Sequence, residues 1–383
     1  MEAVGPTSIG SDLPALFQPI AIGKINLKHR IVLAPLTRVR ATTKTHLPVL
    51  PLVKTYYEQR ASVPGTLLIS EATVIAEEAC GWDGVPGIWN DGQVKVWKEI
   101  TEAVHSKGCS MFLQLWAIGR AARPKILSEN EHPYIAPSAV KLSKRPVDEP
   151  PPREMAVEEI KRYCRLFAEA AKRAVNEAGF DGVEVHGSSP YLIGQFLQEG
   201  SNIREDEYGG NIEGRSKFPL EVVDALVEAV GQDRVGVRLT PWTNYDFGTD
   251  KPIPQYLHFV SEMAKAHSKL AYLHMVEPRH NPSDWKTPRV PKEGESNDVF
   301  RKAWAPRPFI SCGCYTRETA IETAERKGDL IAFGQAFIAN PDLPFRLEKN
   351  ISLEKPDHST FYTPDAKGYT DYPLSKEFEK NQA

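Results

Sequence analysis

Residues 157–191 read VEEIKRYCRLFAEAAKRAVNEAGFDGVEVHGSSPY, a helical pattern followed at once by a short apolar strand. In the first part, apolar side chains such as Ile160 and Phe167 recur at spacings of three and four, which predicts an amphipathic helix that stops at Gly179. The second part, residues 182–187, is a β-rich apolar run. A helix that leads directly into such a strand is typical of folds built from parallel βα units. The segment therefore predicts an α/β protein.

Similar runs occur along the rest of the chain. Together with the first one they make eight predicted strands, at residues 30–36, 65–72, 110–116, 182–187, 235–241, 270–277, 308–313 and 330–334. Further helical patterns separate several of them, at residues 213–231, 254–268 and 316–328. Eight parallel strands with helical crossovers close a barrel, so we predict an eight-stranded parallel β/α (TIM) barrel. An open doubly wound sheet is the alternative, which the lack of a GxGxxG turn after the first strand disfavours.

The domain organisation follows from length and from one proline-rich stretch. The chain has 383 residues, a size that a single barrel with insertions reaches. The stretch at 132–155 lies between the third strand and its helix, and we expect it to be a long excursion over the barrel mouth. We therefore predict one domain over residues 1–383, with flexible tails at 1–12 and 374–383.

Composition excludes several classes of function. A formal net charge of -3 argues against a nucleic-acid-binding protein, which would show a basic face. No apolar run is long enough to span a bilayer, and no secretory signal is visible. The five scattered cysteines are typical of reduced thiols in a cytoplasmic protein, and no set of His and Cys residues completes a metal site. No feature of the sequence indicates an oligomeric state.

The predicted strand ends carry most of the chemistry, because barrel enzymes place their active sites at the C-terminal ends of the strands. Gly313 and Gly334 follow the last two strands, where backbone N–H groups often bind a phosphate. Arg238 supplies a fixed positive charge, and Gln114 can both donate and accept hydrogen bonds. A phosphate site at one end and a donor, acceptor and cation at the other match flavin mononucleotide (FMN).

The chain also resembles a known family. The stretches LKHRIVLAPLTRVRA (27–41), GFDGVEVHG (179–187), SNIREDEYGGNIEGR (201–215) and TFYTPDAKGYTDYP (360–373) are similar to those of the old yellow enzyme family of flavin-dependent ene-reductases. The similarity covers nearly the whole chain, from about residue 13 to 373. It implies FMN as the cofactor, NADPH or NADH as the reductant, and a small-molecule enone or enal as the substrate.

The resemblance implies roles for residues at the cofactor site. Thr37 is expected to contact a flavin carbonyl, and Gln114 the pyrimidine edge. Arg238 is expected to lie by the flavin N1, where it would stabilise the anionic reduced form. The remaining expected cofactor contacts are Pro35, Ala72, Gly313, Cys314, Gly334 and Gln335.

A second set of implied roles concerns the substrate. Reduction of an activated alkene needs a hydrogen-bond donor at the carbonyl oxygen and a proton for the α-carbon. The resemblance assigns the first role to His186, with Ser189 as a second donor, and the second role to Tyr191. The expected pocket walls are Trp82, Trp116, Trp242, Phe361 and Tyr362.

Four positions depart from the family pattern. Ser189 stands where Asn or His is usual, and Pro190 and Ala72 stand where glycines are usual. Gln335 stands where the family has an arginine on the flavin phosphate, and a neutral amide cannot make a charge-assisted bidentate pair there.

These departures leave more than one function open. In the first hypothesis, the protein keeps FMN and reduces, or isomerises through reduction, an unusual enone or enal of secondary metabolism. In the alternative, the flavin site has degenerated, and Tyr191 and His186 serve as the acid–base pair of a flavin-independent isomerase, dehydratase or cyclase. A third hypothesis is a protein that only binds a ligand.

Overall fold

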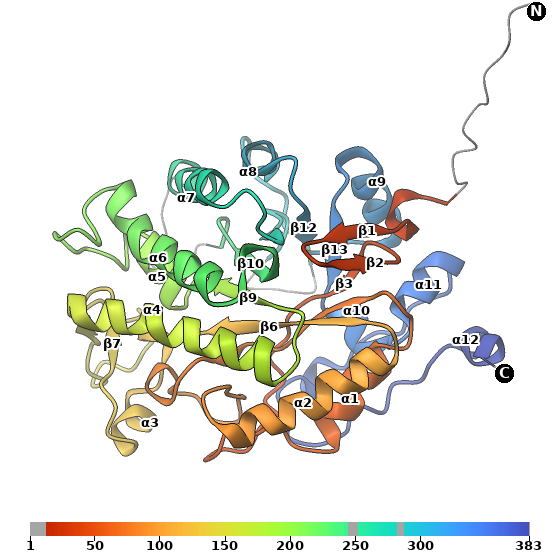
Figure 1. Ribbon diagram of the computed structural model, residues 1–383, viewed down its shortest axis with the longest axis horizontal. Helices are drawn as coiled ribbons and strands as arrows, with labels where there is room; N and C mark the ends of the chain where they lie inside the picture. Colours follow the sequence, from red (N-terminus) through yellow and green to blue (C-terminus); the bar gives the residue numbers. More distant parts are fainter. Residues whose placement is uncertain (1–12, 244–251, 282–286, 383) are drawn as a thin grey trace, which may run out of the picture.

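The computed structural model describes residues 13–243, 252–281 and 287–382. At its centre, a parallel sheet closes on itself (Figure 1). The barrel strands are β3 (Ile31–Leu33), β4 (Leu67–Ile69), β6 (Ser110–Trp116), β9 (Gly182–Gly187), β10 (Val235–Leu239), β11 (Tyr272–Val276), β12 (Phe309–Cys312) and β13 (Leu330–Phe333). The pairing of β4 with β6 completes the ring, and a short extra strand, β5 (Thr73–Val74), also pairs with β6. The predicted eight-stranded barrel is confirmed, and each predicted strand contains one of these eight.

Helices surround the barrel (Figure 1). They are α1 (Leu52–Arg60), α2 (Asp91–Ser106), α3 (Pro124–Glu129), α4 (Val157–Lys172), α5 (Leu192–Leu197), α6 (Ile212–Val230), α7 (Pro252–Ala266), α8 (Asp298–Trp304), α9 (Arg317–Lys327), α10 (Gln335–Ala339), α11 (Leu343–Lys349) and α12 (Lys376–Gln382). The predicted helices at 213–231, 254–268 and 316–328 correspond to α6, α7 and α9. The one predicted to stop at Gly179 is α4, whose continuation over Arg173–Glu177 is π-helical.

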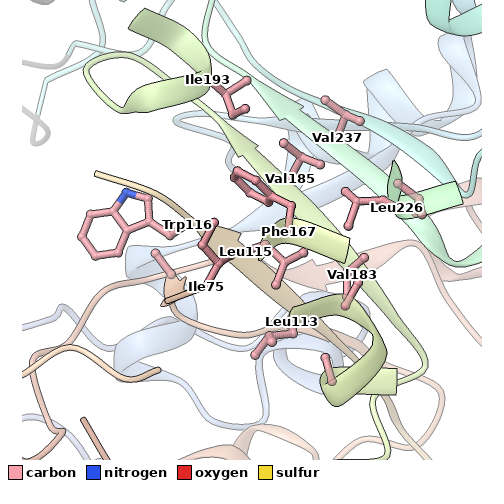
Figure 2. Packing of buried hydrophobic residues seen from close by; sticks show 14 of the residues in the cluster. Ile75, Leu113, Leu115, Trp116, Phe167, Val183, Val185, Ile193, Leu226 and Val237 are labelled. Atoms are coloured by element: carbon pink, nitrogen blue, oxygen red, sulfur yellow. The ribbon is translucent and has the colours of Figure 1, made fainter. Parts of the chain in front are cut away.

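Both faces of the barrel strands are buried, which explains their near-continuous apolar runs. One apolar cluster fills the inside of the barrel and includes Val32, Leu67, Phe112, Ile310 and Leu330. A larger cluster lies between the strands and the helices. Figure 2 shows part of it, where strand residues Leu115, Val183, Val185 and Val237 face Phe167 of α4 and Leu226 of α6.

A hairpin that the sequence did not predict contributes to the barrel interior. Strands β1 (Ile20–Ile22) and β2 (Ile25–Leu27) pair antiparallel, and Ile22 and Leu27 are buried in the inner cluster. Lys24, in the turn of the hairpin, pairs with Asp233, which lies just before β10. The hairpin therefore lies at the N-terminal ends of the strands, and the C-terminal ends are left for a functional site.

The excursion after the third barrel strand packs against the loop that follows β6. It contains the short parallel pair β7 (Ile135–Ala136) and β8 (Arg153–Glu154). The Arg145 guanidinium donates to the carbonyl oxygens of Ala121 and Ala122 at 2.6 and 2.8 Å. These contacts place the excursion at the C-terminal side of the barrel.

The C-terminal segment differs from the expected flexible tail. Residues 376–382 form α12, and the Phe378 ring is buried 5.2 Å from the Phe345 ring. The Ser375 N–H donates to Asp342 Oδ2 at 3.0 Å. The sequence did not predict this packing, because the segment has a single phenylalanine among charged residues. The other expected flexible tail, at 1–12, lies outside the described residues.

Two findings about the described ranges bear on function. None of their helices combines the length and apolarity that a bilayer crossing needs. Within the same ranges, His, Cys, Asp and Glu side chains form no group of three that could hold a metal ion.

His29, just before β3, gives the fold a pH-dependent stability. Its Nε2 is 3.0 Å from Thr66 Oγ1, and its Nδ1 accepts from the Ile31 N–H at 3.2 Å. Burial lowers the pKa of His29 to about 4. The unfolded chain therefore binds a proton near pH 6.5 that the folded chain does not bind, so stability falls as the pH drops below that value.

We expect His29 to reduce the free energy of unfolding by about 2 kcal/mol between pH 6.5 and pH 5, at about 1.4 kcal/mol for each pH unit. Urea unfolding of wild type and His29→Gln at both pH values measures this. On going from pH 6.5 to pH 5, the free energy of unfolding of His29→Gln should fall by about 2 kcal/mol less than that of wild type. Equal losses in the two proteins would show that His29 is not responsible.

Candidate active site

The inside of the barrel becomes polar toward the C-terminal strand ends. Gln114 of β6, Glu184 and His186 of β9, Arg238 of β10 and His274 of β11 occupy neighbouring positions there. In the strand register, Gln114 pairs with Glu184, and Arg238 pairs with both His186 and His274. The structure therefore brings together three predicted site residues, Gln114, His186 and Arg238, with two that were not predicted.

His186 is a neutral hydrogen-bond donor in this setting. Its side chain is buried, and its Nδ1 accepts from the Ser188 N–H at 3.4 Å. Burial, and then the nearby positive charge of Arg238, hold the pKa of His186 well below its ordinary value. A neutral ring that accepts at Nδ1 carries its proton on Nε2. The Nε2–H group is therefore the one that can donate to a ligand.

An aromatic cluster adjoins His186. The ring centroid of Tyr191 lies 4.8 Å from those of His186 and Trp116, and Trp82 lies 5.9 Å from Trp116. The indole N–H of Trp116 is buried and has no hydrogen-bond partner among the described residues. Tyr191 is the residue before α5, so the backbone of the strand end and the helix start fixes its position. Four residues of the predicted site thus lie in one group.

The hydroxyl of Ser189 makes its hydrogen bond within its own loop. The Ser189 hydroxyl donates to Gln198 Oε1 at 3.2 Å, and its N–H donates to Thr240 Oγ1 at 3.2 Å. It is the preceding residue, Ser188, that meets Arg238, whose Nη1 donates to the Ser188 hydroxyl at 2.9 Å. The Ser189 hydroxyl is thus engaged within the loop in this structure, and its role as a second carbonyl donor stays a prediction.

The predicted pocket walls are not all together. Trp242 donates from its indole N–H to Asn297 Oδ1 at 2.6 Å and packs on Phe300 of α8, whereas Trp82 and Trp116 pack on each other. Phe361 is buried, with the Arg38 guanidinium 5.4 Å from its ring, while Tyr362 is 58% exposed. Trp82 and Trp116 therefore remain the best supported walls.

The loops after β12 and β13 contain the glycines that are predicted to bind a phosphate. Gly313 has a φ of +119°, a conformation that side chains other than hydrogen rarely adopt. At Gly334, a Cβ would come within 3.2 Å of Leu36. The side-chain oxygen of Gln335 lies 3.1 Å from His358 Nε2. Both loops thus require glycine for reasons of conformation or packing, and a neutral side chain stands at the position where the family has an arginine.

A cation near this region escaped the sequence analysis. Arg279, just after β11, donates from Nε to the Gly313 carbonyl at 2.8 Å and stacks 3.9 Å above the Tyr315 ring. An arginine three residues past a strand end was the available signal. Cys314 and Cys312 beside it are free thiols whose pKa burial raises.

Comparison with known proteins identifies the family. Residues 15–354 match the model of the NADH:flavin oxidoreductase / NADH oxidase family. The chain belongs to this family. It is 45% identical over 372 residues to NADP-dependent oxidoreductase lnbE of Aspergillus flavus, covering 94% of this chain and 96% of that protein. It is 44% identical to the probable inactive reductase easA of Epichloe festucae var. lolii, covering 95% of this chain and 96% of that one.

Two further similarities are informative. Chanoclavine-I aldehyde reductase fgaOx3 of Penicillium roqueforti is 44% identical over 375 residues, covering 95% of this chain and 98% of that one. The solved structure of morphinone reductase superimposes with a TM-score of 0.85 at 39% identity, covering 96% of this chain and 98% of that chain. This NADH:flavin oxidoreductase is thus a barrel enzyme that uses FMN and NAD(P)H.

The residues present fit FMN. The Nε–H of Arg238 is a buried donor without a partner among the described residues, as an electron-rich flavin edge would require. Gln114 is buried on β6, two strands from Arg238, and Thr37 is half-buried beyond the end of β3. That Gly313 and Gly334 bind the FMN phosphate through their backbone stays a prediction. Ala72 is buried, so its methyl group does not project into open space where the flavin ring would lie.

Restoring a charge at position 335 should tighten FMN binding. We expect Gln335→Arg to lower the Kd for FMN about ten- to hundredfold, the effect of about 1.5–3 kcal/mol for one charged hydrogen bond. Fluorescence titration of the apoprotein measures the Kd. Riboflavin, which has no phosphate, should bind both proteins equally. If Gln335→Arg lowers the Kd for riboflavin as much as the Kd for FMN, residue 335 does not contact the phosphate.

Proposed function

We propose that the protein reduces the C=C bond of an α,β-unsaturated carbonyl compound, an enal or enone of natural-product metabolism. Fungal relatives support this choice, because two of them are named chanoclavine-I aldehyde reductase and aldehyde reductase FrzD. The neutral donor at His186, beside the phenol of Tyr191, is the observation that carries the proposal.

The two side chains divide the work on the substrate. The chemistry that FMN supplies when bound is transfer of a hydride from the nicotinamide to the β-carbon of the alkene. His186 donates from Nε2 to the carbonyl oxygen and stabilises the negative charge that develops there. Tyr191 gives its phenolic proton to the α-carbon. Both come from the end of β9 and the start of α5, so their separation is fixed by regular structure.

Other residues hold the reacting groups in place. Gln114, Thr37 and Arg238 would bind the flavin ring, and the Arg238 guanidinium would offset negative charge on it. Trp116 and Trp82 would confine an unsaturated substrate beside His186 and exclude water from it.

A direct test uses the purified protein and a simple enal such as cinnamaldehyde. The protein should be yellow, NADPH should bleach it without oxygen, and the enal should restore the colour with formation of the saturated aldehyde. An isomerised enal as the product would instead indicate redox-neutral use of the same flavin. Failure of several enals and enones to restore the colour would contradict the proposed reaction.

The flavin-independent alternative draws on one observation, the neutral Gln335 next to His358 in place of a phosphate-binding arginine. It predicts a colourless protein that gains no colour on addition of FMN. In that case, product formed without any nicotinamide would support acid–base catalysis by Tyr191 and His186.

A further inference from the structure

A carboxylate and an imidazole are buried side by side within the barrel. Glu184 and His274 each have 0% of their surface exposed. Glu184 Oε2 lies 2.8 Å from His274 Nδ1, and Glu184 Oε1 accepts from Gln114 Nε2 at 2.7 Å. Buried carboxylates are rare without a partner or a purpose, and the substrate chemistry described above uses neither Glu184 nor His274.

Glu184 determines the orientation of its neighbours, because a carboxylate can only accept hydrogen bonds. Gln114 must turn its NH₂ group toward Glu184. Its carbonyl oxygen is then left as an acceptor, which no hydrogen bond within the described ranges engages. His274 must donate from Nδ1, and burial lowers its pKa, so its Nε2 is an unprotonated acceptor. A single carboxylate thus fixes both an amide and a ring.

Glu184 also opposes the charge of Arg238. The two side chains come from adjacent strands, and Arg238 lies beside His274 in the register. Both charges act on the Cys312 thiol: burial raises its pKa most, Arg238 lowers the pKa, and Glu184 raises it. Their fields therefore overlap within a low-dielectric interior, where each weakens the other.

We propose that Glu184, held by His274, is a positioning residue for the cofactor. Glu184 orients Gln114 so that the Gln114 carbonyl oxygen accepts from the flavin N3–H. Its negative charge also offsets part of the positive charge of Arg238, which keeps the reduction potential of bound FMN low. The inference depends on the proposed use of FMN by Gln114 and Arg238. Glu184 acts through these two residues and does not touch the substrate.

The isosteric variant Glu184→Gln tests both parts. The Gln114 amide can then turn its NH₂ toward the N3–H, so the Kd for FMN should rise about tenfold. With Arg238 unopposed, the ratio of affinities for reduced and oxidised FMN should rise at least tenfold, about 30 mV in potential. Fluorescence titration and an anaerobic dye-linked titration measure these two quantities. A merely structural residue would lower the melting temperature and leave the potential unchanged.

The exchange variant Gln114→Glu/Glu184→Gln keeps one carboxylate and one amide. The carboxylate at 114 still accepts from N3–H, so FMN should bind more tightly than in Glu184→Gln. The potential should fall below that of the single variant and of wild type, because the charge now lies on the residue that contacts the ring. This variant also provides the readout if Glu184→Gln does not fold.

Unchanged Kd and potential in these variants would overturn the inference. If the variants are unchanged but the wild-type protein binds FMN and reduces an enal, the proposed function still holds. Wild type that binds no FMN would overturn both.

Discussion

Replacing Tyr191 with phenylalanine should slow reduction of an enal by about 10²–10⁴-fold, while NADPH should still reduce the bound FMN at close to the wild-type rate. The phenol is the proposed proton source for the α-carbon, and the hydride step from the nicotinamide does not need that proton. Anaerobic stopped-flow measurements separate the two half-reactions through the absorbance of oxidised flavin. The loss should appear only when the enal is mixed with reduced enzyme.

The phenylalanine variant is a conservative one, since it keeps the ring that packs 4.8 Å from both His186 and Trp116. Tyr372→Phe is a matched control, because the Tyr372 hydroxyl accepts from the Asp357 N–H at 2.8 Å in the C-terminal region. That variant should leave both half-reactions unchanged. Equal losses in the two half-reactions of Tyr191→Phe would mean that the tyrosine shapes the site without donating a proton.

The barrel was predictable because its strands leave a strong signature. Runs such as 110–116 and 182–187 are buried on both faces, so they read as continuous apolar segments between helical patterns. The hairpin of β1 and β2 left no comparable signature, since three residues are too few to show alternation. Helix α12 was concealed in the same way, because one buried phenylalanine in a charged segment resembles a solvated tail.

The candidate site was predictable as far as backbone position decides it. His186, Tyr191 and Gln114 come together because the ends of parallel strands meet on one rim. The direction of the Ser189 hydroxyl was not predictable, since it depends on Gln198, nine residues away on the far side of α5.

The buried pair was missed for a different reason. Glu184 and His274 stand inside strands that otherwise read as core, and no local pattern shows that they meet. One signal was present, however. Glu184 is two residues from His186 and therefore shares its inward face. A carboxylate on the same face as a predicted catalytic histidine should be treated as part of the site.

Removal of the His186 imidazole should have the other large effect. We expect His186→Ala to lower kcat/KM for an enal about 10²–10³-fold, the usual cost of losing one donor to a developing oxyanion. We expect little compensation for the lost hydrogen bond to the substrate oxygen, because the Ser189 hydroxyl of the same loop already donates to Gln198 Oε1. Steady-state kinetics with NADPH and cinnamaldehyde measure it.

The charge state of His186 makes this prediction specific. Because its pKa lies well below the ordinary value, the ring is neutral throughout the range from about pH 6 to 8, and protonation of His186 should produce no inflection in kcat/KM there. His186→Asn, which retains an N–H donor, should recover part of the lost rate, whereas His186→Leu should not. A wild-type profile with an inflection near pH 6.5 that disappears in His186→Asn would show instead that the imidazole acts in its charged form.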